Sequence, residues 1–173
     1  MKNIRNRSAK IIYALLLVFW MGFIYYMSSR TGYESKAAST GLTNLIADLA
    51  VRIRILNQED MTYETISKIH NWIRQAAHFF EYMILGVLAF QFFKQYISKK
   101  ILRIAAVSIL FCIVYSISDE IHQYFVPGRA TDILDVITDT AGSITGISIA
   151  LLSAKFIIKI RSSKGSVNAI IES

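Results

Sequence analysis

Four long apolar stretches alternate with polar segments along the chain, and each is long enough for a helix that crosses a membrane. They lie at residues 11–28, 76–94, 101–118 and 133–155. About 17 to 25 mostly apolar residues in helical form are needed to cross the hydrocarbon core of a bilayer. The pattern therefore predicts an all-α integral membrane bundle of about four transmembrane helices.

The connection of residues 31–75 carries a second, weaker apolar pattern. Five apolar residues recur there at helical spacing and mark one face, namely Leu42, Leu45, Ile46, Leu49 and Ile53. Such spacing predicts an amphipathic helix, which we expect to rest on the outer surface of the membrane. Ile66, Ile69 and Ile73 form a second stripe that should continue directly into the second span. Two roles fit this connection, a cap on the bundle and a lid over a site.

Composition agrees with one helical membrane domain over residues 1–173. Apolar residues make up 54% of the chain, and only one proline and eight glycines interrupt it, which favours long helices. Basic residues before the first stretch also occur in signal peptides, but no small-x-small site follows it, which favours an uncleaved span. Cys112 is the single cysteine and has no partner for an internal disulfide.

The charge distribution predicts how the chain sits in the membrane. The net charge is +7, yet the bases flank the apolar stretches and form no single basic face, which excludes a nucleic-acid partner. Residues 1–10, 94–103 and 155–173 hold twelve of the nineteen bases and one acid, Glu172. Because cytoplasmic segments are rich in Lys and Arg, both termini of this multi-pass protein should face the cytoplasm.

Polar residues from four separate segments are predicted to meet at the outer membrane boundary. They are Ser28, Ser29, Arg74, His78, Glu81, Asp119, Glu120, His122, Gln123, Arg129, Asp132, Asp135 and Asp139. Ionisable groups inside a membrane are costly and mark function by default. Because so many acids crowd a few bases, a functional cavity is favoured over a purely structural lock between helices.

Helical spacing groups these residues further. Arg74, His78 and Glu81 lie at i, i+4 and i+7 and share one helix face. The three aspartates at 132, 135 and 139 share another face, which continues through Gly142 and Gly146. A small-xxx-small pair allows close approach of another helix. That partner is either a helix of the same bundle or a second copy of the chain, which would make a homo-oligomer.

The segment between the last two spans is predicted to turn at Pro127-Gly128. Such a turn would carry Arg129 over the ends of the third and fourth spans. A guanidinium in that position suits a phosphate or a carboxylate, which it binds through two parallel hydrogen bonds. His70 has no polar partner nearby in sequence, and we expect it on the surface.

At these positions the sequence resembles the VanZ-like family of bacterial membrane proteins. The resemblance rests on Ser28-Ser29, on the spacing of Arg74, His78 and Tyr82, and on the block from Ser118 to Arg129 with its sequel through Gly142. It extends over residues 28–146. It implies a bacterial cell-envelope protein of the plasma membrane, related to one that lowers susceptibility to glycopeptide antibiotics, chiefly teicoplanin.

We expect the outward-facing site to bind an anionic amphiphile, such as a lipid-linked wall precursor or a glycopeptide-type molecule. Arg74 and Arg129 would hold the anionic group, and the apolar tail would lie between helices among membrane lipids. The predicted binding residues are Ser28, Ser29, Arg74, His78, Gln123, Arg129, Asp132 and Asp135. A transporter is disfavoured because the inner halves of the spans lack polar residues that would continue a path.

An intramembrane hydrolase or transferase on the same envelope molecules is the alternative. The sequence requires no cofactor, but a divalent metal would suit its candidate ligands, which are His78, Glu81, Asp119, His122 and Asp139. Without a metal, crowded carboxylates divide acid and base roles, and the catalytic candidates are Glu81, Asp119, Glu120, His122 and Asp139. No recognised metal-binding or nucleophile motif supports this alternative.

Overall fold

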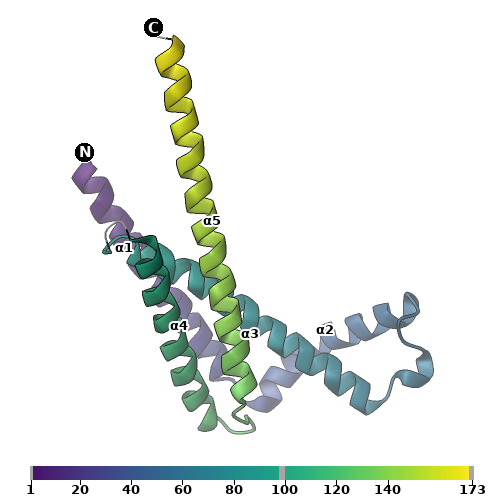
Figure 1. Cartoon of the computed structure of the whole chain (residues 1–173). Coiled ribbons are helices and arrows are strands. Elements are labelled where there is room, and N and C mark those ends of the chain that lie inside the picture. The colour runs from purple at the N-terminus through teal and green to yellow at the C-terminus, as the bar shows by residue number, and fades with distance from the viewer. Residues whose placement is uncertain (1, 98–99, 172–173) are drawn as a thin grey trace.

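The computed structural model describes the backbone of residues 2–97 and 100–171, and the side chains of residues 7–97 and 100–156. The regular elements in these ranges are all helices, joined by turns and loops, and the ranges contain no strand, which confirms the predicted fold class (Figure 1). The elements are α1 (Lys2–Ser28), α2 (Gly32–Arg52), the 3-10 turn η1 (Gln58–Asp60), α3 (Tyr63–Phe93), α4 (Ile101–Tyr124) and α5 (Ile133–Ile171).

Four of these helices are long and apolar enough to cross a membrane, as predicted. The spans are Arg7–Ser28, Tyr63–Phe93, Ile101–Tyr124 and Ile133–Phe156. The second begins well before the predicted start at residue 76, because the Thr62 side chain caps the helix at the Thr65 N–H and the isoleucine stripe continues without a break. The third runs past its predicted end at residue 118 and carries the polar residues through Gln123 on one helix.

Glycines allow the backbones of α3 and α5 to come into close contact where the two helices cross. Gly142 and Gly146 of α5 lie on the α3 backbone at Phe79 and Met83, and Gly86 of α3 lies on the α5 backbone at Ser143. A Cβ on any of these glycines would collide with main-chain atoms. The predicted small-xxx-small face is therefore used within the chain, and a homo-oligomer through it stays a prediction.

Helix α1 is packed into the same bundle. Leu17 and Ile24 are buried against α3 and α4 in one apolar cluster. The indole Nε1 of Trp20 donates to the Glu81 carbonyl at 2.9 Å, and the Tyr115 hydroxyl donates to the Met21 carbonyl at 2.6 Å. Because α1 also carries Ser28 at its end, this helix positions part of the site.

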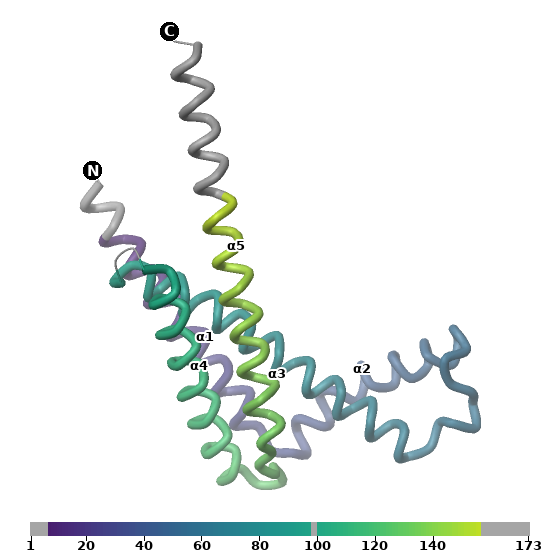
Figure 2. The backbone as a smooth tube through the Cα atoms, in the orientation of Figure 1, coloured from purple at the N-terminus to yellow at the C-terminus, as the bar shows by residue number. Residues whose placement is uncertain are grey.

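The connection of residues 31–75 is a helical hairpin, in which the predicted amphipathic helix is α2 and the second predicted stripe continues directly into the second span as the first turns of α3. We call residues 32–75 the arm: α2, η1 and the first turns of α3 project sideways from the bundle (Figures 1 and 2). Only Thr43 and Ala47 of α2 are buried, whereas the predicted apolar stripe, including Leu45 and Ile53, is exposed. In the described part of the chain, no protein surface covers Leu45, Ile46, Leu49 or Ile53, so these side chains are accessible to lipid.

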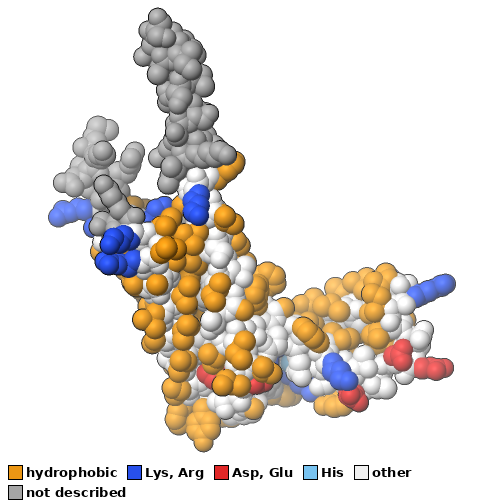
Figure 3. All heavy atoms as spheres, viewed as in Figure 1, with side chains coloured by type: hydrophobic (Ala, Val, Ile, Leu, Met, Phe, Trp, Pro, Cys, Tyr) orange, Lys and Arg blue, Asp and Glu red, His pale blue; other side chains and the backbone are white. Residues whose placement is uncertain are grey.

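Both termini lie at the same end of the bundle, opposite the α4–α5 connection (Figure 1). We call the opposite end, with residues 28–32 and 125–132, the loop end. Figure 3 shows Lys and Arg side chains near the start of α1 and along α5, Asp and Glu side chains near the loop end, and both kinds on the arm. The orientation of the chain in the membrane stays a prediction.

Candidate functional site

Asp119 is the first of three buried aspartates at the loop end. It lies on α4, where the Ser28 hydroxyl of α1 donates to its Oδ2 at 2.8 Å and Gln123 Nε2 donates to the same oxygen at 3.1 Å. Gln123 is one helical turn from Asp119, so both face α1. The Asp119 Oδ1 and Gln123 Oε1 atoms are buried and accept no hydrogen bond from the described residues.

Asp139 is the second buried aspartate, and it joins three helices. The Ser116 hydroxyl of α4 donates to Asp139 Oδ2 at 2.7 Å. His78 of α3 places Nδ1 3.3 Å from Asp139 Oδ1, at ion-pair distance but outside hydrogen-bond geometry. The Tyr82 hydroxyl, one turn from His78, is also buried and has no hydrogen-bond partner in the described part of the chain.

Asp135 is fully buried and holds Arg74 in place. The Arg74 guanidinium contacts both carboxylate oxygens, with Nη1 3.1 Å from Oδ2 and Nη2 3.4 Å from Oδ1. Gln75 Nε2 donates to Asp135 Oδ1 at 2.5 Å, and its Oε1 accepts from the Thr138 hydroxyl at 2.7 Å. Paired contacts of this kind fix the direction of a guanidinium. Arg74 is therefore anchored between α3 and α5.

Arg129 is held by main-chain atoms. The Pro127-Gly128 turn forms as predicted, with a φ of 75° at Gly128, and the Gly32 N–H donates to the Pro127 carbonyl at 3.2 Å. The Arg129 Nε donates to the Arg30 carbonyl at 3.2 Å and Nη2 to the Met27 carbonyl at 3.4 Å. Among the described side chains, no carboxylate lies at ion-pair distance from this guanidinium.

Electrostatics around Arg129 reflect its half-buried position in the loop. Burial has the largest effect and lowers its pKa from the ordinary value, and the nearby Arg74 guanidinium lowers that pKa further. Asp119, Asp135 and Glu81 oppose this shift from longer range. Two guanidinium groups are thus close enough to repel each other at the loop end, a condition that an anion between them would relieve.

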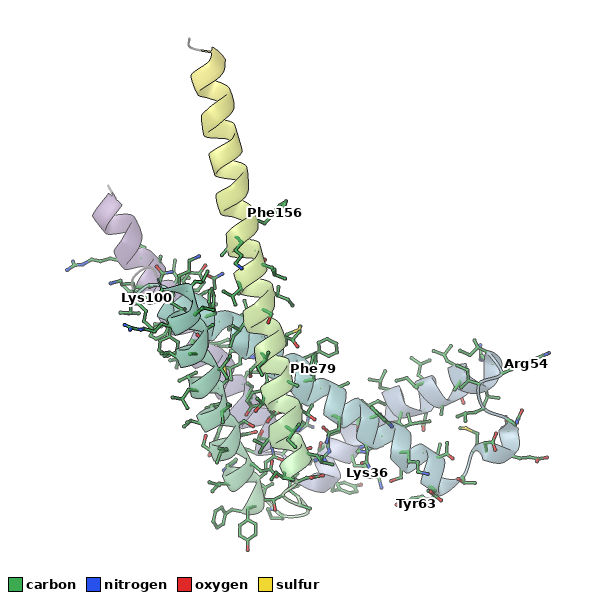
Figure 4. All side chains as sticks on the ribbon, in the orientation of Figure 1. Lys36, Arg54, Tyr63, Phe79, Lys100 and Phe156 are labelled. Atoms are coloured by element: carbon green, nitrogen blue, oxygen red, sulfur yellow. The ribbon has the colours of Figure 1, made fainter. Side chains whose placement is uncertain are left out.

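Two adjoining cavities open where the arm meets the bundle. The inner cavity has a volume of about 260 Å³ and is lined in part by Ser28, Arg30, His78 and Glu81. The arm cavity, of about 470 Å³, is lined by residues of α2, α3 and the α4–α5 loop. Figure 4 labels Lys36 on α2 and Tyr63 at the start of α3, and both line the arm cavity. Both cavities share the side chains of Ser35, His70, Arg74 and Arg129.

Each buried aspartate contacts one residue of the inner cavity wall. Asp119 contacts Ser28, Asp139 contacts His78, and Asp135 contacts Arg74. The aspartates therefore lie one layer behind the wall, where they orient the side chains that face the cavity. Predicted site residues from α1, α3, α4, α5 and the connecting loop are brought together at one end of the bundle.

Besides the three buried aspartates and Gln123, three other predicted site residues line neither cavity, namely Ser29, Glu120 and His122. The Ser29 hydroxyl pairs with His122 Nε2 at 3.0 Å, and the imidazole stacks on Tyr25. Glu120 Oε1 accepts from the Asp132 N–H at 2.6 Å and so holds the start of α5. The Asp132 carboxylate caps α5 at the Leu134 N–H and also lines the arm cavity.

The predicted metal ligands do not gather around one point. Asp119 and Asp139 each bind a serine hydroxyl, and His122 turns toward Ser29. In the described ranges, no three His, Cys, Asp or Glu side chains converge closely enough to hold an ion. The arrangement instead offers guanidinium, imidazole and hydroxyl donors around a cavity, which is suited to binding an anion.

Several residues at the site escaped the sequence analysis. His70 was expected on the surface, but it is half-buried, and its Nε2 is buried without a partner among the described residues. The reason is that α2 folds back beside α3 and covers that face. Gln75, Ser116 and Thr138 were not predicted as site residues. The sequence offered one signal for them: each is a polar residue that lies next to a predicted site residue or about one helical turn from it.

Comparison with known proteins gives one match. No curated protein and no solved structure is similar enough to this chain to count as a relative. A family model described as VanZ/LLP1 matches residues 13–155. This range contains every residue of the two cavities and all four spans, except for the start of the first span and the last residue of the fourth. The chain therefore belongs to the VanZ/LLP1 family, in agreement with the resemblance seen in its sequence motifs.

Proposed function

We propose that this protein binds an anionic amphiphile at the outer face of the bacterial cell membrane, with the anionic group held between Arg74 and Arg129. The observation that carries the proposal is Arg129, a half-buried guanidinium whose hydrogen-bond partners among the described residues are main-chain carbonyl groups. A buried charge without a counter-charge is unfavourable. A phosphate or carboxylate in the inner cavity would supply that counter-charge.

The charge of the cavity walls favours the same class of ligand. The two cavities together are lined by four bases, Lys36, Arg30, Arg74 and Arg129, and by two acids, Glu81 and Asp132. Arg74 is neutralised in part by Asp135, yet it still faces both cavities. The half-buried His70 imidazole adds a hydrogen-bond donor between the two chambers.

The orientation follows from the placement of charge. Lys and Arg near the termini mark that end as cytoplasmic, so the loop end and its cavities face outward. There the accessible amphiphiles are lipid-linked wall precursors and glycopeptide-type molecules. The proposal extends to teicoplanin: cells that produce the protein should show lower susceptibility to this antibiotic than cells that produce its Arg129→Gln variant.

Binding to the purified protein in nanodiscs tests the proposal. The probe is a polyprenyl diphosphate, compared with the uncharged polyprenol of the same chain length. Charge-assisted hydrogen bonds contribute about 1.5–3 kcal/mol, so Arg129→Gln should weaken diphosphate binding by at least about tenfold and leave polyprenol binding unchanged. The control is Arg54→Gln, which removes the same charge at the tip of the arm (Figure 4). Equal diphosphate affinity in the Arg129 variant would overturn the proposal.

A hydrolase or transferase acting without a metal is the second candidate, and Glu81 favours it. This carboxylate lines the inner cavity beside His78, and no hydrogen bond to it is found in the described part of the protein. An acid with that freedom can exchange a proton with a bound substrate. Release of phosphate from the diphosphate probe, lost in Glu81→Gln with binding retained, would support catalysis. Binding without any release supports the binding function alone.

A further inference from the structure

A third cavity runs along the side of the bundle between α3 and the start of α5. Its volume is about 680 Å³, and we call it the lateral groove. Its apolar lining consists of Trp72, Ala76, Phe79, Phe80 and Leu134. Figure 4 labels Phe79 on α3 where that helix passes α5. The groove therefore lies beside the crossing, between the start of α5 and the part of α3 that leads into the crossing.

The lateral groove is continuous with the site already described. Arg74 lines the groove, the arm cavity and the inner cavity, so its guanidinium stands where all three meet. Asn71 and Asp132 are shared by the groove and the arm cavity. Asp135 holds Arg74 at this junction, and Asp135 is in turn held by a hydrogen bond from Gln75. A ligand at Arg74 can thus extend in two directions.

The two directions differ in chemistry. Hydroxyl and amide side chains are more frequent in the arm cavity than in the lateral groove, with Ser35, Thr40, Thr43, Asn44, Ser67, Asn71 and Thr131 on its walls. Such groups donate and accept hydrogen bonds and match a sugar or a peptide. The groove has three aromatic and two aliphatic side chains among its lining residues, and its Trp72, Phe80 and Leu134 are exposed on the outside of the bundle. That lining matches a hydrocarbon chain.

We propose that the ligand is a lipid phosphate with a hydrogen-bonding head group, and that its three parts are separated at Arg74. The hydrocarbon chain lies in the lateral groove, the phosphate lies between Arg74 and Arg129, and the sugar or peptide head fills the arm cavity. The chain enters sideways from the bilayer between α3 and α5. The assignment rests on the proposed function for the phosphate position, and it adds the chain path and the head-group class.

A bulky residue in the groove tests the chain path. Ala76→Phe places an aromatic ring among the lining residues, and Ala106→Phe makes the same change on an exposed position of α4 that lines none of the cavities. The probes are a long-chain polyprenyl phosphosugar and the matching sugar 1-phosphate without a chain. Ala76→Phe should weaken the lipid probe by at least about tenfold and leave the sugar phosphate unchanged, whereas Ala106→Phe should change neither.

The outcomes separate this inference from the proposed function. If Arg129→Gln weakens both probes but Ala76→Phe weakens neither, the phosphate site stands and the groove assignment is wrong. If Arg129→Gln weakens neither probe, the proposed function itself fails. For the head group, Asn44→Ala should weaken the phosphosugar and leave the polyprenyl phosphate without sugar unchanged. If the unmodified protein bound the polyprenyl phosphosugar and the polyprenyl phosphate with equal affinity, the assignment of the head group to the arm cavity would be wrong.

A photoreactive chain gives a second measurement that does not depend on a variant folding. A polyprenyl phosphosugar with a diazirine in its chain should label peptides of α3 around residues 72–80 and the start of α5. Excess unlabelled lipid should remove that labelling. Labels confined to α4 or to the outer face of α1, or labels that survive competition, would overturn the proposed path.

Discussion

The α3–α5 crossing and the arm are both built from helices, but the helices are packed tightly in the crossing and loosely in the arm. At the crossing, three glycines bring two helix backbones into direct contact, and Asp135, Asp139 and Ser143 are buried beside them. In the arm, α2 buries only Thr43 and Ala47 and exposes its apolar stripe. The crossing therefore holds its polar side chains in fixed positions. The arm has few buried contacts with the rest of the protein, so we expect lipid to fix its position.

The site is built where these two regions meet. Arg74, His78 and their aspartates belong to the crossing, while Ser35 and Lys36 reach the cavities from the arm. A fixed set of charged groups with one lightly packed wall suits a ligand with a constant phosphate and a large head. Regions with few buried contacts open at lower free energy than packed cores. The contrast predicts that variants of the two regions fail in different ways.

Gly146→Ala should have the largest effect, because its Cβ would meet the Met83 main chain. Overpacking of this kind costs about 2–3 kcal/mol, so thermal unfolding in detergent should occur at clearly lower temperature. The matched control is Gly41→Ala in α2, where a Cβ would meet no atom within 4 Å and where alanine favours the helix. A Gly146 variant as stable as the control would show that the crossing is looser than described.

Asp135→Ala should have the next largest effect. It removes the carboxylate that anchors Arg74 and leaves Gln75 without one acceptor, at an expected cost of about 2 kcal/mol because Arg74 is partly exposed. Binding of an anionic lipid should weaken as well, since Arg74 loses its fixed direction. The control is Glu64→Ala, which breaks an exposed pair with Lys68 and should leave the unfolding temperature unchanged. Equal behaviour of the two variants would contradict the anchoring role.

The combined change Leu45→Asn and Leu49→Asn should have the smallest effect on stability. Both side chains are exposed on the apolar stripe, so the bundle should unfold at its usual temperature. In nanodiscs, however, amide hydrogen exchange in α2 should accelerate several-fold, because the stripe no longer holds the arm on the bilayer. Asp48→Asn, on the polar side of α2, is the control. Unchanged exchange in the double variant would mean that lipid does not hold the arm.

Much of this arrangement was predictable, because the helical spacing of apolar residues and the positions of charged residues can be read from nearby sequence. Four apolar stretches predicted the spans, and the spacing of Asp135, Asp139 and Gly142 predicted the buried face of α5. The contribution of α2 to the cavity walls was not predictable, since the path of a hairpin depends on how its helices pack. His70 shows the consequence: its surroundings come from a helix about thirty residues earlier, so nothing near it in sequence indicated burial. The polar partners Gln75 and Ser116 were hidden for the same reason.

Helix α3 has 31 residues, which at 1.5 Å per residue gives a rod of about 46 Å, whereas the hydrocarbon layer is about 30 Å thick. One continuous rod thus serves both as a wall of the membrane bundle and as half of the protruding hairpin. Because α3 is unbroken and packs on α5 at Phe79, Met83 and Gly86, a rigid movement of the hairpin would also tilt the part of α3 inside the bundle. Binding of a ligand between the arm and the bundle would therefore be coupled to the tilt of α3 within the membrane.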